Sequence, residues 1–282
     1  MAPTQRHRIL TLPDSRTRRR STALVRYVLD QAKADFDDRY PNARFGPVLA
    51  LVAAYEEEAN IGAVLKAMPT LAGDLEVSTL VVVDGGTDGT AQVARDSGAF
   101  TCVLPVNLGQ GAALRLGYEL AAAHGAQYVV TLDADGQNDP SELADRIEPL
   151  VDGTADFVIA SRRLGTDETT DRLRRAGVHL YAGILNAIVS QKLTDSSNGY
   201  RAFRIELLND VAPHLVQDQY QTSEVVITAA SRGWRIVEQP TLWHPRASGQ
   251  SKKGGNLIFG FSYARAIATT WYRVTVGGGA KS

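Results

Sequence analysis

Short apolar runs alternate with amphipathic stretches along most of the chain. Five runs of four to six residues have the length and composition of buried strands: 48–53, 80–83, 100–104, 129–132 and 157–160. Three stretches between them carry apolar residues at helical spacing: 60–71, 90–97 and 110–123. Strands that alternate with helices predict an α/β fold, with a mostly parallel sheet and helices on both of its faces.

The pattern is less regular after Arg162. We expect helices near Val178–Val189 and Ser223–Arg232, a β-hairpin over Arg235–Trp243, and a last helix from about Asn256. Before this region, Asp139, Pro140 and Glu142 form a strong helix start, with a capping residue, a proline at the first position and an acid three residues after the cap. We therefore expect one domain over 47–255 and a C-terminal amphipathic helix with a flexible tail over 256–282.

Residues 1–46 differ from the rest of the chain and form an N-terminal extension. A basic cluster at 16–20 precedes a stretch, 21–36, in which Leu24, Val28 and Ala32 share one helical face. Three aspartates at 35–38 then cancel the positive charge. We interpret the extension as a basic, solvated arm, partly helical or disordered. Attraction to anionic lipid or to a polyanionic partner is the alternative.

Composition narrows the possible classes of protein. The 282 residues, 44% hydrophobic and 22% charged, suit a globular protein with a large core. Thirty basic and thirty-one acidic residues nearly balance, which argues against a nucleic-acid partner. Cys102 is the only cysteine, so no intrachain disulfide forms, and we expect a cytoplasmic location. The longest apolar stretch, 257–276, contains Arg265 and Arg273, and a central Arg costs roughly 2.5–3.5 kcal/mol on insertion scales, so no membrane span is expected.

The strongest candidate chemistry follows the apolar run at 129–132. Asp133 and Asp135 come at the end of that run and share one side at strand spacing. Two carboxylates held this close repel each other unless a proton or a cation lies between them. Mg²⁺ or Mn²⁺ resolves the repulsion and leaves positions for phosphate oxygens of a substrate. An acidic surface turn is the alternative that this motif alone leaves open.

Three other stretches carry weaker signals. Tyr55 and Glu57 follow the first strand and suit stacking against a base and accepting its hydrogen bonds, or they form an acidic helix start. Asp84 before Gly85-Gly86 suits a ribose or base contact, or a plain glycine turn. The helix that opens at Gln110 can present N–H groups to an anion, and Arg115 one turn later is either a surface cation or a phosphate contact.

Four motifs, taken in chain order, resemble the nucleotide-sugar half of inverting family-2 glycosyltransferases with the GT-A fold: VAAYEEEANI, VVVDGGTDGT, NLGQGAALRLGY and VVTLDADGQNDP. Later segments are similar to the dolichyl-phosphate mannose synthase branch: SRR at 161–163, DSSNGYRAFR at 195–204, YQTSEVVITAASRGWRIVEQP at 220–240 and PRASGQSKKGG at 245–255. The resemblance covers about 48–255. It implies a Rossmann-like GT-A domain that moves a hexosyl group from a GDP- or UDP-linked sugar with Mg²⁺ or Mn²⁺.

The resemblance also implies roles for matching positions. We expect the nucleotide-sugar pocket to be lined by Ala53, Tyr55, Glu57, Asp84, Gln110, Asp133 and Ala134. The metal would be held by Asp133, Asp135 and Gln137. Phosphates of donor or acceptor would contact Arg162, Arg201, Arg246, Ser251 and Lys252, with Arg115 as a further candidate. The expected catalytic residues are Asp135, Arg201 and Glu224, of which the last stands where the family carries an acid facing the sugar.

Two departures from the family pattern concern the nucleoside contacts. Val83 precedes Asp84 where the family commonly has a second acid, so one contact is missing or replaced. Ala53-Ala54 stand where Pro-Thr is usual, which affects the rigidity of the first loop more than its role.

The acceptor class depends on whether the chain supplies a general base. Many relatives carry an Asp directly after the Glu, whereas here Val225 follows Glu224. A phosphate acceptor is already ionised and needs no base, so the missing Asp and the Arg and Lys cluster favour a polyprenyl phosphate. The alternative is a hydroxyl of a small soluble acceptor, with Glu224 as base.

The last helix and the acidic motif each leave an alternative open. The aromatic and basic residues of 257–265 fit an interfacial helix at the cytosolic membrane face, which predicts a peripheral, membrane-associated enzyme. A helix packed on the domain, or a dimer contact, is equally consistent with that stretch. A phosphatase with Asp133 as nucleophile is a further alternative, but it leaves the acidic loop at 56–58 unexplained.

Overall fold

The computed structural model describes residues 15–169, 180, 182–189, 191–219, 221–246 and 256–277, without the side chains of 15–22 and 256–262. Ser251 and Lys252, both expected at a phosphate, lie outside these ranges. Residues 178, 179 and 181 of the helix expected at 178–189 also lie outside these ranges, and 182–186 are helical.

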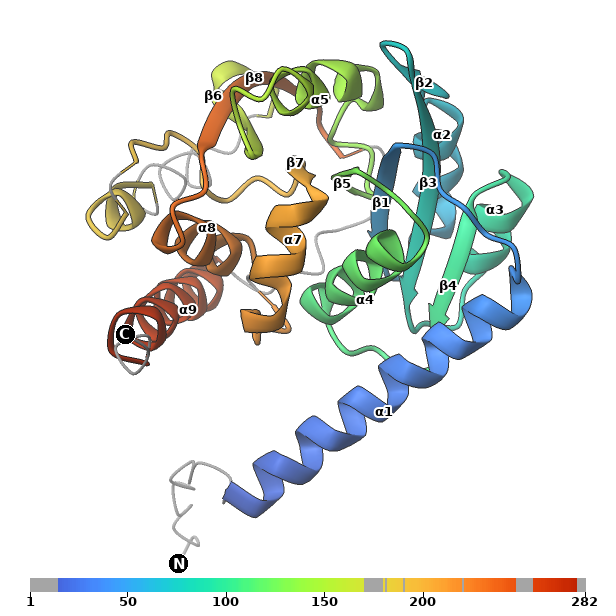
Figure 1. Ribbon diagram of the computed structural model, residues 1–282, viewed down its shortest axis with the longest axis horizontal. Coiled ribbons are helices and arrows are strands. Elements are labelled where there is room, and N and C mark those ends of the chain that lie inside the picture. The colour runs from blue at the N-terminus through green and yellow to red at the C-terminus, as the bar shows by residue number, and fades with distance from the viewer. Residues whose placement is uncertain are drawn as a thin grey trace, which may run out of the picture.

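One mixed sheet organises the described chain (Figure 1). At its centre β1 (Val48–Ala54) pairs in parallel with β3 (Leu75–Asp84) and β5 (Tyr128–Asp133), and β4 (Phe100–Leu104) is parallel to β3. The short β2 (Leu71–Ala72) is antiparallel to β3. Beyond β5, β7 (Arg201–Arg204) is antiparallel to both β5 and β6 (Phe157–Asp167). The expected α/β fold with a mostly parallel sheet is therefore confirmed.

The β-hairpin expected over Arg235–Trp243 is wrong. Ile236–Trp243 form a single strand, β8, parallel to β6 at the edge of the sheet. Gln239-Pro240 resemble a turn in the sequence, but an edge strand accommodates proline because its missing N–H faces away from the ladder. The pairing with β6 shifts register between Ser161 and Thr166, close to this proline.

Helices cover both faces of the sheet and bury its strands on both sides. In β1, Leu49 and Leu51 belong to one core cluster, whereas Val48, Ala50 and Val52 belong to the other. The first cluster includes residues of α1 (Ser15–Arg39), α4 (Gln110–Ala123), α7 (Ile205–Val211), α8 (Gln221–Ser231) and α9 (Asn256–Gly277). The second includes residues of α2 (Glu58–Lys66), α3 (Thr90–Asp96) and α5 (Leu143–Val151). Burial on both faces explains why the strands are continuous apolar runs.

Two short 3₁₀ helices adjoin α5 and α7. The first, Pro140–Glu142, leads into α5 and is capped by Asp139, whose carboxylate accepts from the N–H of Ser141 at 2.9 Å, as the start signal predicts. The second, Ala212–His214, ends α7.

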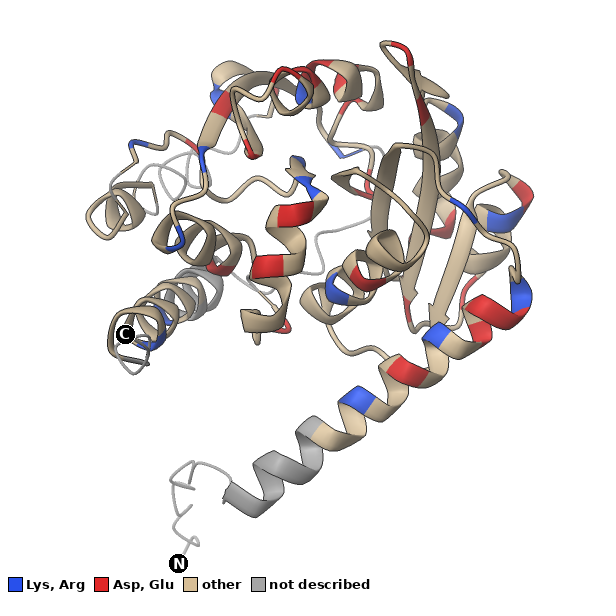
Figure 2. Cartoon of the chain, viewed as in Figure 1, with Lys and Arg blue, Asp and Glu red and all other residues tan. Residues whose placement is uncertain are grey.

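The N-terminal helix α1 packs on the domain through its second half. Leu29, Ala32 and Phe36 are buried, and the Cys102 thiol of β4 donates to the carbonyl of Ala32 at 3.4 Å. Burial raises the pKa of that thiol to about 12. The solvated-arm interpretation therefore does not hold for this half. The first half projects beyond the domain, where Leu24 is 64% exposed (Figure 1). Charges of both signs follow one another along α1 (Figure 2).

The C-terminal helix α9 begins at Asn256, as expected, and packs against α8. Tyr263, Ala266 and Ile267 are buried, whereas Trp271 and Tyr272 are exposed. Among the helices of the described ranges, we find none with both the length and the apolar character needed to cross a membrane.

Candidate active site

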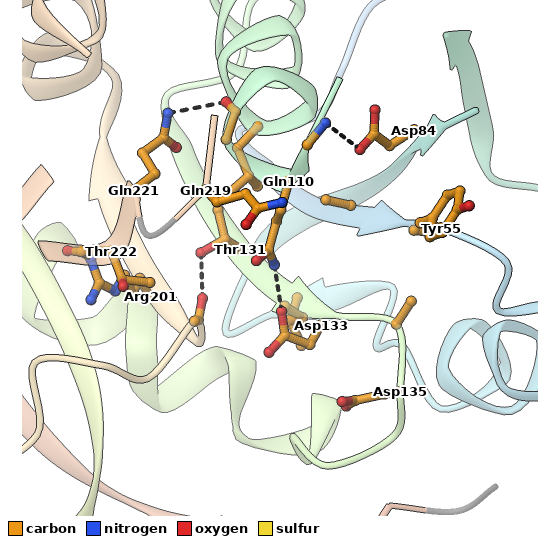
Figure 3. Close-up of a pocket in the computed structure, with 18 of the residues that line it drawn as sticks. Tyr55, Asp84, Gln110, Thr131, Asp133, Asp135, Arg201, Gln219, Gln221 and Thr222 are labelled. Atoms are coloured by element: carbon orange, nitrogen blue, oxygen red, sulfur yellow. Dashed lines mark hydrogen bonds between the residues drawn. The ribbon is translucent and has the colours of Figure 1, made fainter. Parts of the chain in front are cut away.

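A cavity of about 450 Å³ lies where β1, β3 and β5 end. Parallel strands bring their carboxyl ends to one edge of the sheet, so the loops after all three strands meet there. The residues expected at the nucleotide sugar all border this cavity: Ala53, Tyr55, Glu57, Asp84, Gln110, Asp133 and Ala134. Asp135, Arg201 and Arg246 border it as well. Figure 3 shows the labelled side chains around the cavity.

Asp133 presents its carboxylate beside a glycine. The Gln110 side chain donates to Asp133 Oδ1 at 2.8 Å, which orients the carboxylate from the start of α4 (Figure 3). A Cβ at Gly199 would lie 3.2 Å from both carboxylate oxygens. The glycine therefore leaves room for a ligand against Asp133 that any larger residue would reduce.

Asp135 forms an ion pair with Arg246, which lies 111 positions later in the sequence. Arg246 donates to Asp135 Oδ2 at 2.7 Å and to Glu57 Oε1 at 3.2 Å, so its guanidinium lies between two carboxylates. Asp135 Oδ1 also accepts from the N–H of Gln137 at 3.1 Å. The Gln137 side chain donates to the carbonyl of His244 at 3.1 Å and does not border the cavity. These contacts join the turn after β5 to the segment after β8.

The acids at this edge fit a hard divalent cation. In the ranges that the structure describes, no three or more His, Cys, Asp or Glu residues gather as ligands. Mg²⁺ is nevertheless commonly held by one or two carboxylates and completes its shell with water and substrate phosphates. The position of Arg246 between Asp135 and Glu57 shows that the site accommodates a positive charge. The oxygen donors of Asp133 and Asp135 suit Mg²⁺ or Mn²⁺.

Asp84 fixes a loop at the edge of the cavity. Its two oxygens accept from the N–H groups of Leu108 at 2.7 Å and Gly109 at 2.8 Å. Burial raises the pKa of the Asp84 carboxyl, and the two N–H donors offset part of that effect. Gly85, at φ +73°, lets the loop pass so closely that a Cβ would lie 2.5 Å from the nitrogen of Asn107. Asp84 thus borders the cavity with both oxygens already bound to the backbone.

Arg201 places a positive charge in the cavity wall. Its guanidinium is buried and donates to the carbonyls of Asn198, Thr222 and Ser196 at 2.6–2.7 Å. Desolvation lowers its pKa, and its hydrogen bonds just named go to neutral carbonyls rather than to a carboxylate. The charge therefore favours an anion on this side of the cavity.

Among the described residues, the predicted cations Arg115 and Arg162 and the predicted base Glu224 do not border the cavity. Arg162 is buried in a bidentate pair with Asp195, at 2.6 and 2.8 Å. Arg115 donates to the carbonyl of Gln217 and to Asp218. The Glu224 side chain has no exposed area and accepts from the N–H groups of residues 216 and 217 and from Arg273.

Several residues that line the cavity could not be predicted as site residues from the sequence. Four of them border the cavity from helices: Tyr118 of α4, Gln221 and Thr222 of α8, and Tyr263 of α9. Each lies in an amphipathic helix, where the pattern predicts that a tyrosine belongs to the core and a glutamine to the surface. The contacts between helices decide that these four side chains meet at the site.

Comparison with known proteins gives consistent matches. The sequence profile described as Glycosyl transferase family 2 matches residues 50–212. A dolichyl-phosphate hexose transferase of Haloferax volcanii is 31% identical, with 74% of this chain and 87% of that protein covered. An undecaprenyl-phosphate mannosyltransferase of Micrococcus luteus is 28% identical, covering 75% and 89%.

A solved structure shares the fold. Glucosyl-3-phosphoglycerate synthase of Mycobacterium tuberculosis, crystallised with Mn²⁺, uridine diphosphate and phosphoglyceric acid, superimposes with a TM-score of 0.63. The match covers 86% of this chain and 81% of that one, at 20% identity. The expected GT-A fold is thereby confirmed, and the sequence matches agree with the resemblance drawn from the motifs.

Proposed function

This chain belongs to glycosyl transferase family 2, and from that premise we propose that it moves a hexosyl group from a GDP- or UDP-linked sugar to a polyprenyl phosphate. One observation carries the proposal: the Asp133–Asp135 pair and the Tyr55–Glu57 loop border a single cavity at the carboxyl ends of the strands. The names of the two similar proteins, which refer to dolichyl and undecaprenyl phosphate, support the acceptor class.

The donor would extend across the cavity from Tyr55 to α8. Its base would stack on Tyr55, and its ribose would lie near Glu57 and the loop that Asp84 holds. Its diphosphate would lie at Asp133 and Asp135. A divalent cation held there would neutralise the charge that develops on the leaving diphosphate. Gln137, expected as a third ligand, does not border the cavity and is left out of this proposal. Arg246 already lies within 2.7 Å of Asp135 and would offer its guanidinium to the same phosphates.

The acceptor would approach from the side of Arg201. An oxygen of the acceptor phosphate would attack the anomeric carbon, and the bond from that carbon to the nucleoside diphosphate would break, which inverts the configuration. The phosphate is ionised at neutral pH, so no general base is needed. The positive charge of Arg201 supports an anionic acceptor.

Glu224 weighs against the alternative acceptor, a hydroxyl of a small soluble molecule. A general base must lie within hydrogen-bond reach of the proton that it removes. The Glu224 oxygens accept from the backbone of residues 216 and 217 and from Arg273, and Glu224 does not border the cavity. We accordingly propose a peripheral enzyme at the cytosolic membrane face, where the exposed Trp271 and Tyr272 of α9 suit the headgroup region.

The test is substitution of Asp135. With undecaprenyl phosphate, Mn²⁺ and radiolabelled GDP-mannose or UDP-glucose, label moves into the organic phase as product forms. Asp135→Ala should lower this rate by roughly 10²- to 10³-fold, as expected when a group that stabilises transition-state charge is lost. Asp96→Ala, which removes an exposed acid of α3, is the control and should leave the rate unchanged. A near-normal rate for Asp135→Ala would discard the assignment.

A further inference from the structure

Gln221, the first residue of α8, carries a buried acceptor without a partner at the cavity. The residue is 4% exposed and borders the cavity. Its amide nitrogen donates to the carbonyl of Gly111 at 3.0 Å (Figure 3). Its amide oxygen has no hydrogen-bond partner in the structure. Buried polar atoms are nearly always paired, so this oxygen needs an explanation.

The orientation of the amide follows from its neighbour. The Gly111 carbonyl only accepts hydrogen bonds, so the amide nitrogen must be the atom that faces it. Turning the amide over would place two oxygens against each other. The unpaired atom of this cavity-lining residue is therefore the oxygen, which requires a donor.

The segment that carries Gln221 is fastened to the start of α4. The N–H of Gly111 donates to the carbonyl of Asp218 at 2.8 Å, and Arg115 donates to the carbonyl of Gln217 at 2.8 Å. A Cβ at Gly111 would lie 2.2 Å from that Gln217 oxygen, so only glycine permits the approach. Gln221 is consequently held in place before any ligand arrives, which lowers the entropic cost of using it.

The position of Gln221 indicates which ligand group it meets. Figure 3 shows Asp133 between Tyr55 and Asp84 on one side and Gln221, Thr222 and Arg201 on the other. A nucleotide sugar carries its base at one end, its diphosphate in the middle and its sugar at the other end. With the base at Tyr55 and the diphosphate at Asp133, the sugar reaches the side of Gln221.

We propose that Gln221 is a specificity residue whose amide oxygen accepts a hydrogen bond from a hydroxyl of the donor's hexosyl group. This inference rests on the proposed function. An ionised phosphate offers no proton to a carbonyl oxygen, so the diphosphate and a phosphate acceptor are unsuited to this position, whereas a sugar hydroxyl is suited to it. A site built to bind a hydroxyl discriminates against sugars that lack it or direct it elsewhere.

The experiment compares binding of the sugar with binding of the nucleotide alone. Dissociation constants for GDP-mannose and GDP, and for UDP-glucose and UDP, are measured by calorimetry with Mn²⁺. Gln221→Met keeps the length of the side chain and removes both polar atoms. It should weaken the sugar nucleotide that binds by about 3- to 10-fold, the usual effect of one neutral hydrogen bond, and change the matching diphosphate by less than about twofold.

Gln191→Met is the matched control. Gln191 also donates its amide nitrogen to a backbone carbonyl, that of Trp234 at 3.1 Å, and also has an unpaired amide oxygen, but it does not border the cavity. This variant should leave all four dissociation constants unchanged. Monodeoxy analogues of the sugar nucleotide test the wild type itself: one analogue should bind about 3- to 10-fold more weakly, and Gln221→Met should not distinguish it.

The outcomes separate the inference from the function on which it rests. Wild-type protein that binds neither nucleotide nor sugar nucleotide overturns both. Wild-type binding with an unchanged sugar nucleotide in Gln221→Met overturns the inference alone. Equal weakening of the diphosphate and the sugar nucleotide, or equal binding of every deoxy analogue by the wild type, also overturns it.

Discussion

The buried pair of Arg162 and Asp195 should contribute to stability rather than to phosphate binding. Arg162 is 8% exposed and Asp195 has no exposed area, and two hydrogen bonds of 2.6 and 2.8 Å join them. Arg162→Met leaves the carboxylate buried without its cation. Removal of one partner of a buried pair costs about 3–5 kcal/mol, so we expect a loss of that size in the free energy of unfolding.

The measurement is urea unfolding at pH 7 of Arg162→Met, Asp195→Asn and the double variant. Each single variant should lose about 3–5 kcal/mol, and the melting temperature should fall by roughly 6–20 °C. The double variant should lose less than the sum, because the second change removes a charge that the first left unpaired. The exposed neighbour Arg163→Met is the control, with an expected change below about 1 kcal/mol.

The same pair predicts how stability depends on pH. Burial alone would raise the pKa of Asp195, but the hydrogen bonds and charge of Arg162 outweigh it and lower the pKa below 3.8. A carboxyl whose pKa is lower in the folded state stabilises the fold above its unfolded pKa. That contribution is complete above about pH 4 and is lost as the pH falls through the folded pKa. The stability difference between wild type and Asp195→Asn should therefore shrink below pH 4.

Two results would refute this reasoning. The first is a loss below about 1 kcal/mol in Arg162→Met, or additive losses in the double variant. The second is unchanged stability together with an affinity for GDP or UDP that falls by about tenfold or more, the size expected of a charged hydrogen bond. The second result would mean that Arg162 binds a phosphate, as the sequence indicated.

Two further substitutions test the surroundings of the cavity. Glu224→Gln should lower the free energy of unfolding by about 1–3 kcal/mol, because Arg273 and the N–H of residue 216 or 217 lose a charged acceptor, and should leave kcat within about tenfold of wild type. A loss of 10²- to 10⁴-fold in kcat at unchanged stability would instead make Glu224 a general base. Gly199→Ala should raise the dissociation constant for Mn²⁺, measured with GDP or UDP present, by roughly 10- to 100-fold, because its Cβ would crowd Asp133 at 3.2 Å. Gly183→Ala, which meets nothing within 4 Å, is its control, and equal Mn²⁺ affinities would show that no cation is held beside Asp133.

The local pattern of the sequence predicted the central strands and the acids at their ends. Tyr55, Asp84 and Asp133 each follow a run that is apolar over its whole length, and strands buried on both faces belong to a parallel sheet. Such a sheet brings the carboxyl ends of neighbouring strands together whatever its exact pairing. The grouping of these residues was therefore predictable without knowledge of any long-range contact.

The partners of the arginine side chains could not be predicted from the sequence in the same way. The sequence offered Arg115, Arg162, Arg201 and Arg246 as equivalent cations, but only Arg201 and Arg246 border the cavity. Arg162 meets Asp195, 33 positions away, and Arg115 meets Asp218, 103 positions away. Which carboxylate or carbonyl a guanidinium reaches depends on how the helices and loops pack, and residue spacing does not encode that.

The sequence by itself determined the α/β class, the strand ends that carry the acids and the start of the helix at Asp139. Only the tertiary structure decided that β8 runs parallel to β6, that α1 is packed through Phe36, and that Gln221 borders the cavity and has an unpaired amide oxygen. The physical reason is that periodicity fixes which side of an element is apolar. The partner of that side, and the hydrogen bonds of any polar atom buried there, are fixed by contacts between distant segments.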